Sequence, residues 1–177
     1  MPGDHDPTLR KLKVISGGQT GVDRAALDVA LKHGIECGGW CPVGRLDEVG
    51  RIPERYPLKE LEEGSFADRT LRNVKDSDGT VIIYCRGLRG GTDYTLACCK
   101  QLQRPHQLID AAATVLDEAA SLIANFVRGH KINRLNVAGP RQSEWPAGYE
   151  YAFAALELFL DSITSKSRSM RKSSNHS

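Results

Sequence analysis

Apolar residues along the chain gather in short runs that are separated by longer, periodic stretches. The short runs are typical of β-strands in length and composition, and they cover residues 12–16, 35–40, 80–85, 106–110 and 134–138. Between them, apolar residues recur at helical spacing, most clearly from Tyr149 to Ile163. Strands that alternate with helices over short connections indicate a parallel sheet covered on both faces. The sequence therefore predicts an α/β fold, a Rossmann-like three-layer α/β/α sandwich with a mostly parallel sheet.

Two of the predicted helices begin with a threonine three residues before an aspartate. Thr20 precedes Asp23, and Thr114 precedes Asp117. In a capping box, the side chains of the first and fourth residues satisfy N–H groups at the start of the helix. We therefore expect both threonines to cap their helices.

The length of 177 residues suits one domain. We expect a flexible N-terminus at residues 1–11, a single Rossmann-like ligand-binding domain at 12–164 and a disordered, basic, serine-rich tail at 165–177. Within the domain, residues 41–58 form a long connection rich in proline, glycine and charge. A long loop in a small domain is often functional, and this one leaves a strand at the edge where open α/β sheets bind ligands.

Composition and charge narrow the classes of function. The chain is 40% hydrophobic and 26% charged, an ordinary globular mixture, and its formal net charge is +2. Removing the four basic residues of 166–177 leaves 20 basic against 22 acidic residues, so the predicted domain is slightly acidic. A nucleic-acid-binding domain is therefore disfavoured, because such a domain presents a basic face to the phosphates.

Several kinds of site and location lack their usual sequence signal. No apolar run approaches the roughly 18 residues that span a membrane, and residues 1–8 do not have the pattern of a signal peptide. The five cysteines are an odd number without zinc-site spacing, and the five histidines are scattered. We therefore expect a cytoplasmic protein with reduced thiols, no membrane partner, no metal ligands and no catalytic residue.

A glycine-rich segment, Ser16-Gly-Gly-Gln-Thr-Gly21, follows the first predicted strand and opens a helix. Glycines let the backbone approach a ligand closely, and the start of a helix offers N–H groups to an anion. Without a following lysine it is not a Walker A loop, and its spacing is not that of a G-x-G-x-x-G motif. The plain alternative is a tight turn with a solvated arginine. The residues of this predicted phosphate site are Gly17, Gly18, Gln19, Thr20, Gly21 and Arg24.

Two further loops follow later strands. Residues 86–92 are rich in glycine and open a helix, and residues 138–144 follow the last predicted strand. The carboxyl ends of parallel strands meet at one edge of a sheet, so the three loops are expected to form one crevice for a small polyanionic ligand. Each arginine taken alone is equally compatible with a solvated side chain. The candidate binding residues of these two loops are Arg89, Gly90, Gly91, Thr92, Gly139, Pro140 and Arg141.

Seven motifs, taken in order, resemble the molybdenum cofactor carrier family over roughly residues 13 to 160. They are residues 16–28, 39–45, 52–58, 69–70, 73–80, 90–92 and 135–141. The resemblance implies a homo-oligomer, a dimer or tetramer, that binds molybdenum cofactor (molybdopterin), a phosphorylated pterin. Such a protein protects its ligand and passes it to a molybdoenzyme. The family tends to have Ala-Glu-Asp-Gly where this chain has Asp47-Glu-Val-Gly50.

The resemblance also extends to a wider Rossmann-like group of nucleotide-ligand proteins, and this group suggests two alternatives. One is an enzyme similar to the nucleoside-monophosphate phosphoribohydrolases, whose motif P-G-G-x-G-T-x-x-E lacks its glutamate here, three residues after Thr92. Glu144 or Glu150 would have to replace it. The other is a nucleotide-ligand sensor or interaction module, suggested by the basic tail. The sequence favours a binding protein without turnover.

Overall fold

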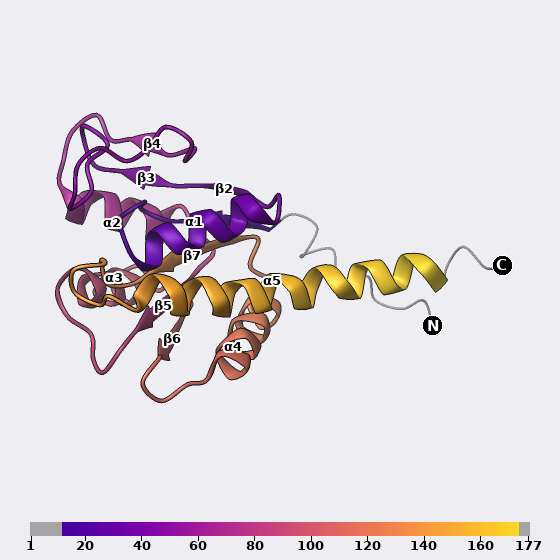
Figure 1. Cartoon of the computed structure of the whole chain (residues 1–177). Helices are drawn as coiled ribbons and strands as arrows, with labels where there is room; N and C mark the ends of the chain where they lie inside the picture. The colour runs from indigo at the N-terminus through magenta and orange to yellow at the C-terminus, as the bar shows by residue number, and fades with distance from the viewer. Residues whose placement is uncertain (1–11, 174–177) are drawn as a thin grey trace.

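The computed structural model of the chain describes residues 12–173, with side chains up to residue 164 (Figure 1). The predicted N-terminal segment 1–11 and residues 174–177 lie outside the described residues. The elements, in chain order, are β1 (Lys13–Ile15), α1 (Val22–Lys32), β2 (Glu36–Gly38), β3 (Trp40–Cys41), β4 (Lys59–Glu60), α2 (Phe66–Lys75), β5 (Gly79–Tyr84), α3 (Gly90–Gln101), β6 (His106–Asp110), α4 (Leu116–Gly129), β7 (Arg134–Ala138) and α5 (Gly148–Ser173).

The main sheet has five strands in the order β2-β1-β7-β5-β6, and every neighbouring pair is parallel. The predicted Rossmann-like α/β fold with a parallel sheet is therefore confirmed. The strands that precede the three glycine-rich loops, β1, β7 and β5, are neighbours at the centre of the sheet. Their carboxyl ends lie at one edge, which is where the loops meet.

Helices cover the sheet on both faces (Figure 1). On one face α5 packs against α1 and α4, and this side holds the larger hydrophobic core. The apolar stripe predicted on the last helix is buried there, through Ala152, Leu156, Phe159, Leu160 and Ile163. On the other face α2 packs against α3 around a small cluster of Val74, Cys98 and Cys99. The fold is thus a three-layer sandwich with an unequal division of its core.

One predicted strand is divided in the structure. The run 35–40 becomes β2 and β3, which belong to different sheets, because the chain turns at Gly39 with a φ of 136°. A Cβ at this residue would lie 2.0 Å from the carbonyl oxygen of Ser16, so only glycine fits. β3 pairs in parallel with β4, a strand that the sequence pattern missed because both of its residues are exposed.

The helix starts also differ from the predictions. α1 begins after Gly21 and α4 after Val115, and neither has a side-chain cap, so the predicted capping boxes at Thr20 and Thr114 are wrong. Longer-range partners take these polar groups: the hydroxyl of Thr20 bonds to Glu48, and the carbonyl of Thr114 accepts from Tyr151. At the other end of the chain α5 continues over residues 165–173, which the sequence assigned to a disordered tail. That segment contains no glycine or proline to stop a helix.

Candidate functional site

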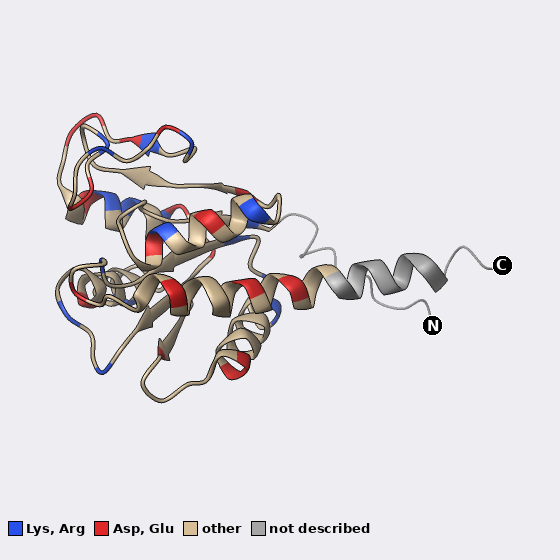
Figure 2. Ribbon diagram, viewed as in Figure 1, with Lys and Arg blue, Asp and Glu red and all other residues tan. Residues whose placement is uncertain are grey.

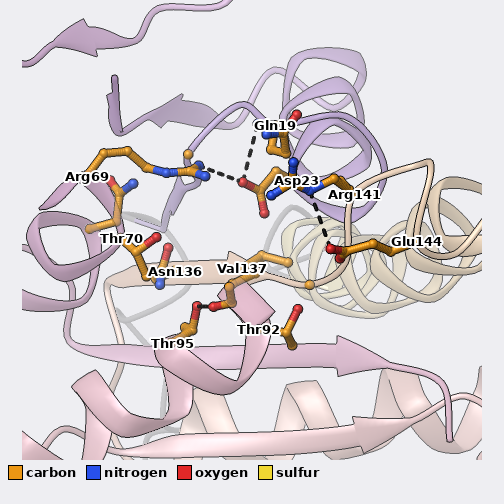
Figure 3. A pocket seen from close by; sticks show the side chains of 15 residues that line it. Gln19, Asp23, Arg69, Thr70, Thr92, Thr95, Asn136, Val137, Arg141 and Glu144 are labelled. Carbon is orange, nitrogen blue, oxygen red and sulfur yellow. Dashed lines mark hydrogen bonds and ion pairs between the residues drawn. The ribbon is translucent and has the colours of Figure 1, made fainter. Parts of the chain in front are cut away.

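A cleft of about 510 Å³, including the space at its mouth, lies at the carboxyl edge of β1, β7 and β5. All three glycine-rich loops contribute to it, as the sequence predicted, and α2 forms a further wall (Figure 3). The residues that line the cleft are Gly17, Gln19, Asp23, Arg69, Thr70, Asn73, Gly91, Thr92, Thr95, Asn136, Val137, Ala138, Gly139, Arg141 and Glu144.

The predicted binding residues divide into two groups. Those that line the cleft are Gly17, Gln19, Gly91, Thr92, Gly139 and Arg141. Those that do not line it are Gly18, Thr20, Gly21, Arg24, Arg89, Gly90 and Pro140. The structure therefore brings all three loops together but presents only part of each to the cleft.

In the first loop, the protein itself occupies the space beside each glycine. A Cβ on Gly17 would lie 1.6 Å from the guanidinium of Arg69, and one on Gly18 would lie 2.4 Å from Leu58. At Gly21 the obstacle is backbone, the carbonyl oxygen of Pro140 at 2.6 Å. These glycines let neighbouring segments approach one another. The conformational freedom that suggested a phosphate cradle serves internal packing at these three positions.

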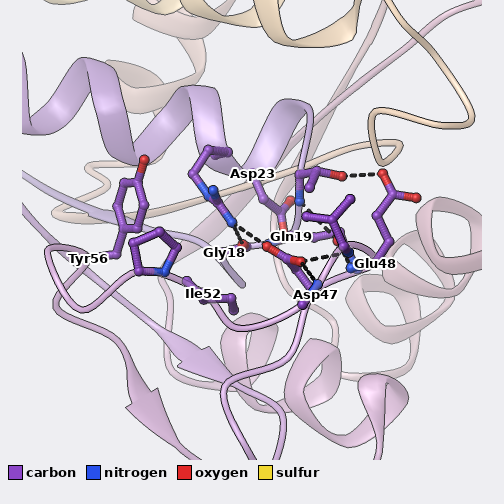
Figure 4. A network of polar contacts seen from close by, with 12 residues as sticks. Gly18, Gln19, Asp23, Asp47, Glu48, Ile52 and Tyr56 are labelled. Carbon is purple, nitrogen blue, oxygen red and sulfur yellow. Dashed lines mark hydrogen bonds and ion pairs between the residues drawn. The ribbon is translucent and has the colours of Figure 1, made fainter.

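Arg24 has protein partners in place of the predicted phosphate. Its Nη2 donates to Asp47 Oδ2 at 2.7 Å and to the carbonyl oxygen of Gly18 at 3.1 Å. Its guanidinium also lies over the ring of Tyr56, 4.8 Å from the centroid. The side chain is only 16% exposed, so it is neither solvated nor directed into the cleft. Arg24 fastens α1 to the loop 41–58 (Figure 4).

The loop 41–58 joins the first and third glycine-rich loops (Figure 4). The carboxylate of Glu48 accepts hydrogen bonds from the hydroxyls of Thr20 and Ser143 and from the Ser143 N–H. Burial raises the pKa of Glu48, but the hydrogen bonds from Ser143 and Thr20 outweigh burial and hold it below its usual range. The Glu48 N–H in turn donates to Gln19 Oε1 at 2.9 Å. Glu48 therefore fixes the distance between two walls of the cleft.

A buried ion pair forms the inner wall of the cleft. Arg69 Nη1 donates to Asp23 Oδ2 at 3.1 Å, and the Gln19 N–H donates to the same oxygen at 3.3 Å (Figure 3). The two side chains are 10% and 8% exposed. Burial raises the pKa of Asp23, and the attraction of Arg69 opposes that shift. Neither residue was among the predicted site residues, although both occur within the motifs that carry the family resemblance.

Polar side chains from α2, α3 and β7 complete the interior. Asn73 spends both ends of its amide on the backbone of Trp40, with hydrogen bonds of 2.8 and 2.9 Å. Asn136 donates to the Thr80 hydroxyl at 3.2 Å, and Thr95 donates to the Gly91 carbonyl at 2.9 Å. Sequence reasoning missed these residues because isolated Asn and Thr residues inside helices and strands give no local signal for a site.

The outer end of the cleft is more open and carries a second ion pair. Arg141 Nε lies 3.5 Å from Glu144 Oε1, and their side chains are 37% and 44% exposed. The first turn of α3, with Gly91 and Thr92, faces the same region. The start of a helix attracts an anion, and an exposed guanidinium adds a positive charge. This end of the cleft is therefore suited to a phosphate group.

A sequence model of the circularly permutated YpsA SLOG family matches residues 14–160. The chain belongs to this family. It is also similar to the solved structure of the "Putative molybdenum carrier protein" from Syntrophus aciditrophicus SB, with 46% identity and a TM-score of 0.83. That similarity covers 85% of this chain and 96% of the other. A comparison with the curated proteins gives no match.

The resemblance inferred from the sequence motifs is thereby confirmed at the level of the family. Every residue that lines the cleft falls within the matched segment 14–160. The cleft is thus built entirely from the part of the chain that defines membership of the circularly permutated YpsA SLOG family.

Metal, membrane and charge patterns add three findings about the described residues. No group of three or more His, Cys, Asp or Glu side chains is placed to hold a metal ion among them. Among them, too, no helix has the length and apolar character needed to cross a membrane. Up to residue 164, α5 carries Glu150, Glu157 and Asp161 and no basic residue, whereas α2 carries both signs of charge (Figure 2).

Proposed function

We propose that this protein binds molybdenum cofactor, a phosphorylated pterin, in the cleft and holds it without chemical turnover. The observation that carries the proposal is the division of the cleft into two ends. The outer end joins a half-exposed arginine to the start of a helix, and the inner end is a buried polar pocket. The name of the 46% identical relative gives the same direction.

The residues of the cleft fit such a ligand. Arg141 and the first-turn N–H groups at Gly91 and Thr92 would hold the phosphate. At the inner end, Gln19 Nε2 is buried without a hydrogen-bond partner among the described residues, and a buried donor of this kind calls for a ligand acceptor. The pterin's own sulfur atoms would carry the molybdenum, and no cysteine lines the cleft.

A carrier must protect its ligand and then release it. The Asp23–Arg69 pair and the Glu48 contacts shape a fixed inner pocket, which shields a heterocycle from water. The outer end stays open, so the phosphate end of the ligand remains accessible to a molybdoenzyme that receives it. A cytoplasmic homo-oligomer, dimer or tetramer, is part of the same proposal.

Native mass spectrometry of the purified protein tests this function directly. We expect a molybdopterin species at about one per subunit, and the same spectrum gives the number of subunits. The Arg141→Ala variant should lose most of the ligand, because a charge-assisted hydrogen bond contributes about 1.5–3 kcal/mol. Arg128→Ala on the exposed side of α4 is the matched control and should retain it. Protein that neither carries nor takes up supplied cofactor would contradict the proposal.

A phosphoribohydrolase-like activity is the second candidate, and one observation favours it. Glu144 lies in the cleft beside Arg141, whereas Glu150 does not line the cleft. A carboxylate near a bound nucleotide can assist cleavage of its N-glycosidic bond. Release of free base from nucleoside monophosphates, abolished in Glu144→Gln and retained in Glu150→Gln, would establish this activity. No release at high protein concentration would leave the carrier function standing.

An interaction module based on the basic tail is the third candidate. The side chains of 165–177 lie outside the described residues, so the structure adds nothing to this hypothesis. Deleting residues 165–177 should abolish any binding to nucleic acid, and persistent binding would point to the domain itself.

A further inference from the structure

The side chain of Gln19 has a fixed orientation at the inner end of the cleft. Its Oε1 accepts two N–H groups, from Thr20 at 3.0 Å and from Glu48 at 2.9 Å. Turning the amide over would direct its NH₂ group at these two donors, so the contacts determine which end is nitrogen. Nε2 is therefore held away from them, and it has no hydrogen-bond partner among the described residues. The residue lines the cleft and is 5% exposed.

Asp23 offers an acceptor beside this donor. Its Oδ2 already accepts from Arg69 and from the Gln19 N–H. Figure 3 shows its other oxygen turned into the cleft, and no hydrogen bond to that oxygen is present among the described residues. Asn136, which is 3% exposed, donates through Nδ2 to Thr80, so its Oδ1 is a second acceptor on the lining. The inner end thus combines one donor with two acceptors.

The charges determine which part of a ligand occupies this end. The Asp23–Arg69 pair is internally compensated, and a phosphate placed there would lie against a carboxylate. The outer end has the half-exposed Arg141 and the start of α3. A phosphorylated heterocycle therefore has one favourable direction of entry, with its uncharged ring innermost.

We propose that Gln19, Asp23 and Asn136 recognise the 2-amino-4-oxo edge of a pterin ring. Gln19 Nε2 donates to the ring carbonyl, and the oxygens of Asp23 and Asn136 accept from the ring N–H and the amino group. This edge has two donors and one acceptor, which complement the two acceptors and one donor of the inner end. The inference rests on the proposed function and names the part of the ligand that gives it specificity.

Two pteridine monophosphates that differ only at position 4 test this recognition. One is neopterin monophosphate, with the 4-oxo group, and the other is its 2,4-diamino counterpart, in which a donor replaces the carbonyl acceptor. Pteridine fluorescence gives the dissociation constant of each from the full-length protein. We expect the 4-oxo compound to bind about tenfold more tightly, because a mismatched buried hydrogen bond leaves polar groups unsatisfied.

Gln19→Glu is the decisive variant. It keeps an oxygen for the Thr20 and Glu48 N–H groups and replaces only the donor Nε2 by an acceptor. We expect the 4-oxo compound to bind about tenfold more weakly and the preference between the two compounds to disappear or reverse. Gln142→Glu, whose amide donates to Pro146 on an exposed loop outside the cleft, is the matched control and should keep the wild-type preference.

The outcomes separate the two proposals. Equal binding of both compounds to the wild-type protein, or an unchanged preference in Gln19→Glu, would overturn the recognition by Gln19 while the binding function stands. If neither compound binds, and supplied molybdenum cofactor is not taken up either, the proposed function and this inference both fail. A loss of binding in Gln19→Glu that affects both compounds equally would indicate general damage to the cleft and would also contradict the inference.

Discussion

The first and second glycine-rich loops look alike in sequence but differ in what surrounds their glycines. In the first loop, side chains or backbone fill the space beside Gly17, Gly18 and Gly21. In the second, a Cβ on Gly87 or Gly91 would meet no atom within 4 Å. The first loop uses glycine to bring parts of the protein together, whereas the second leaves the start of α3 open. Only the second therefore retains the free space that a phosphate cradle requires.

The largest expected effect comes from Gly17→Ala. The new Cβ would displace the Arg69 guanidinium, which lies 1.6 Å from its position, and would separate Arg69 from Asp23. Breaking a buried ion pair costs about 3–5 kcal/mol, so urea denaturation should show a loss of about that size in the free energy of unfolding.

A double-mutant cycle checks the cause of this loss. Arg69→Ala removes both the obstacle and the ion pair, so adding Gly17→Ala to it should cost little more. If the two losses simply add, the first loop is destabilised by something other than the displacement of Arg69.

Gly21→Ala should have the next largest effect, about 2–3 kcal/mol in the free energy of unfolding. The residue has a φ of +80°, and its Cβ would lie 2.6 Å from a backbone oxygen, that of Pro140, which cannot rotate away. Thermal and urea denaturation measure the loss. A stability equal to wild type would mean that the first loop is not as tightly packed as the structure shows.

Glu48→Gln should have a smaller and pH-dependent effect. The pKa of Glu48 lies below its usual value of 4.5 in the folded protein, so its stabilisation is present above pH 4.5 and is lost as the pH falls through the folded pKa. We expect a loss of about 1 kcal/mol at pH 7 that closes near pH 3. Glu62→Gln, on an exposed loop, is the control with no such difference. A gap that persists at pH 3 would contradict a role for the charge.

The smallest effect is expected at Gly91. This glycine lies in the first turn of α3 with open space around it, so Gly91→Ala should leave the free energy of unfolding within about 0.5 kcal/mol of wild type, or raise it slightly. Its consequence should appear in ligand affinity, because the methyl group enters the cleft. A loss of stability comparable to that of Gly21→Ala would remove the contrast between the two loops.

Sequence patterns predicted the main sheet because its strands carry strong local signals. β6 and β7 have the predicted bounds, and β5 is shifted by one residue. β3 and β4 were not predicted as a separate sheet, because the turn at Gly39 depends on the close approach of Ser16 and the residues of β4 are exposed. Both features arise from contacts between distant segments, which a local pattern does not contain.

The candidate site shows the same division. The position of the cleft followed from the parallel sheet, since loops after neighbouring strands must meet. The roles of individual side chains did not follow. Arg24 was expected to meet a phosphate, but Asp47, 23 residues away in sequence, occupies its guanidinium. Arg69 reaches the cleft from α2 to pair with Asp23, and neither spacing nor composition distinguishes it from the chain's other arginines.

The pairing of β1 with β7 has a consequence for the order in which the protein becomes competent. Gln19 and Arg141 belong to opposite ends of the chain and meet only because the first strand pairs with the last. A growing chain without β7 has no complete cleft, so loading has to follow synthesis of nearly the whole domain. Because only the complete fold binds, ligand at a hundred times its dissociation constant adds about 2.7 kcal/mol to the stability of the whole molecule. The cargo thereby acts as the final clasp between the two ends of the chain.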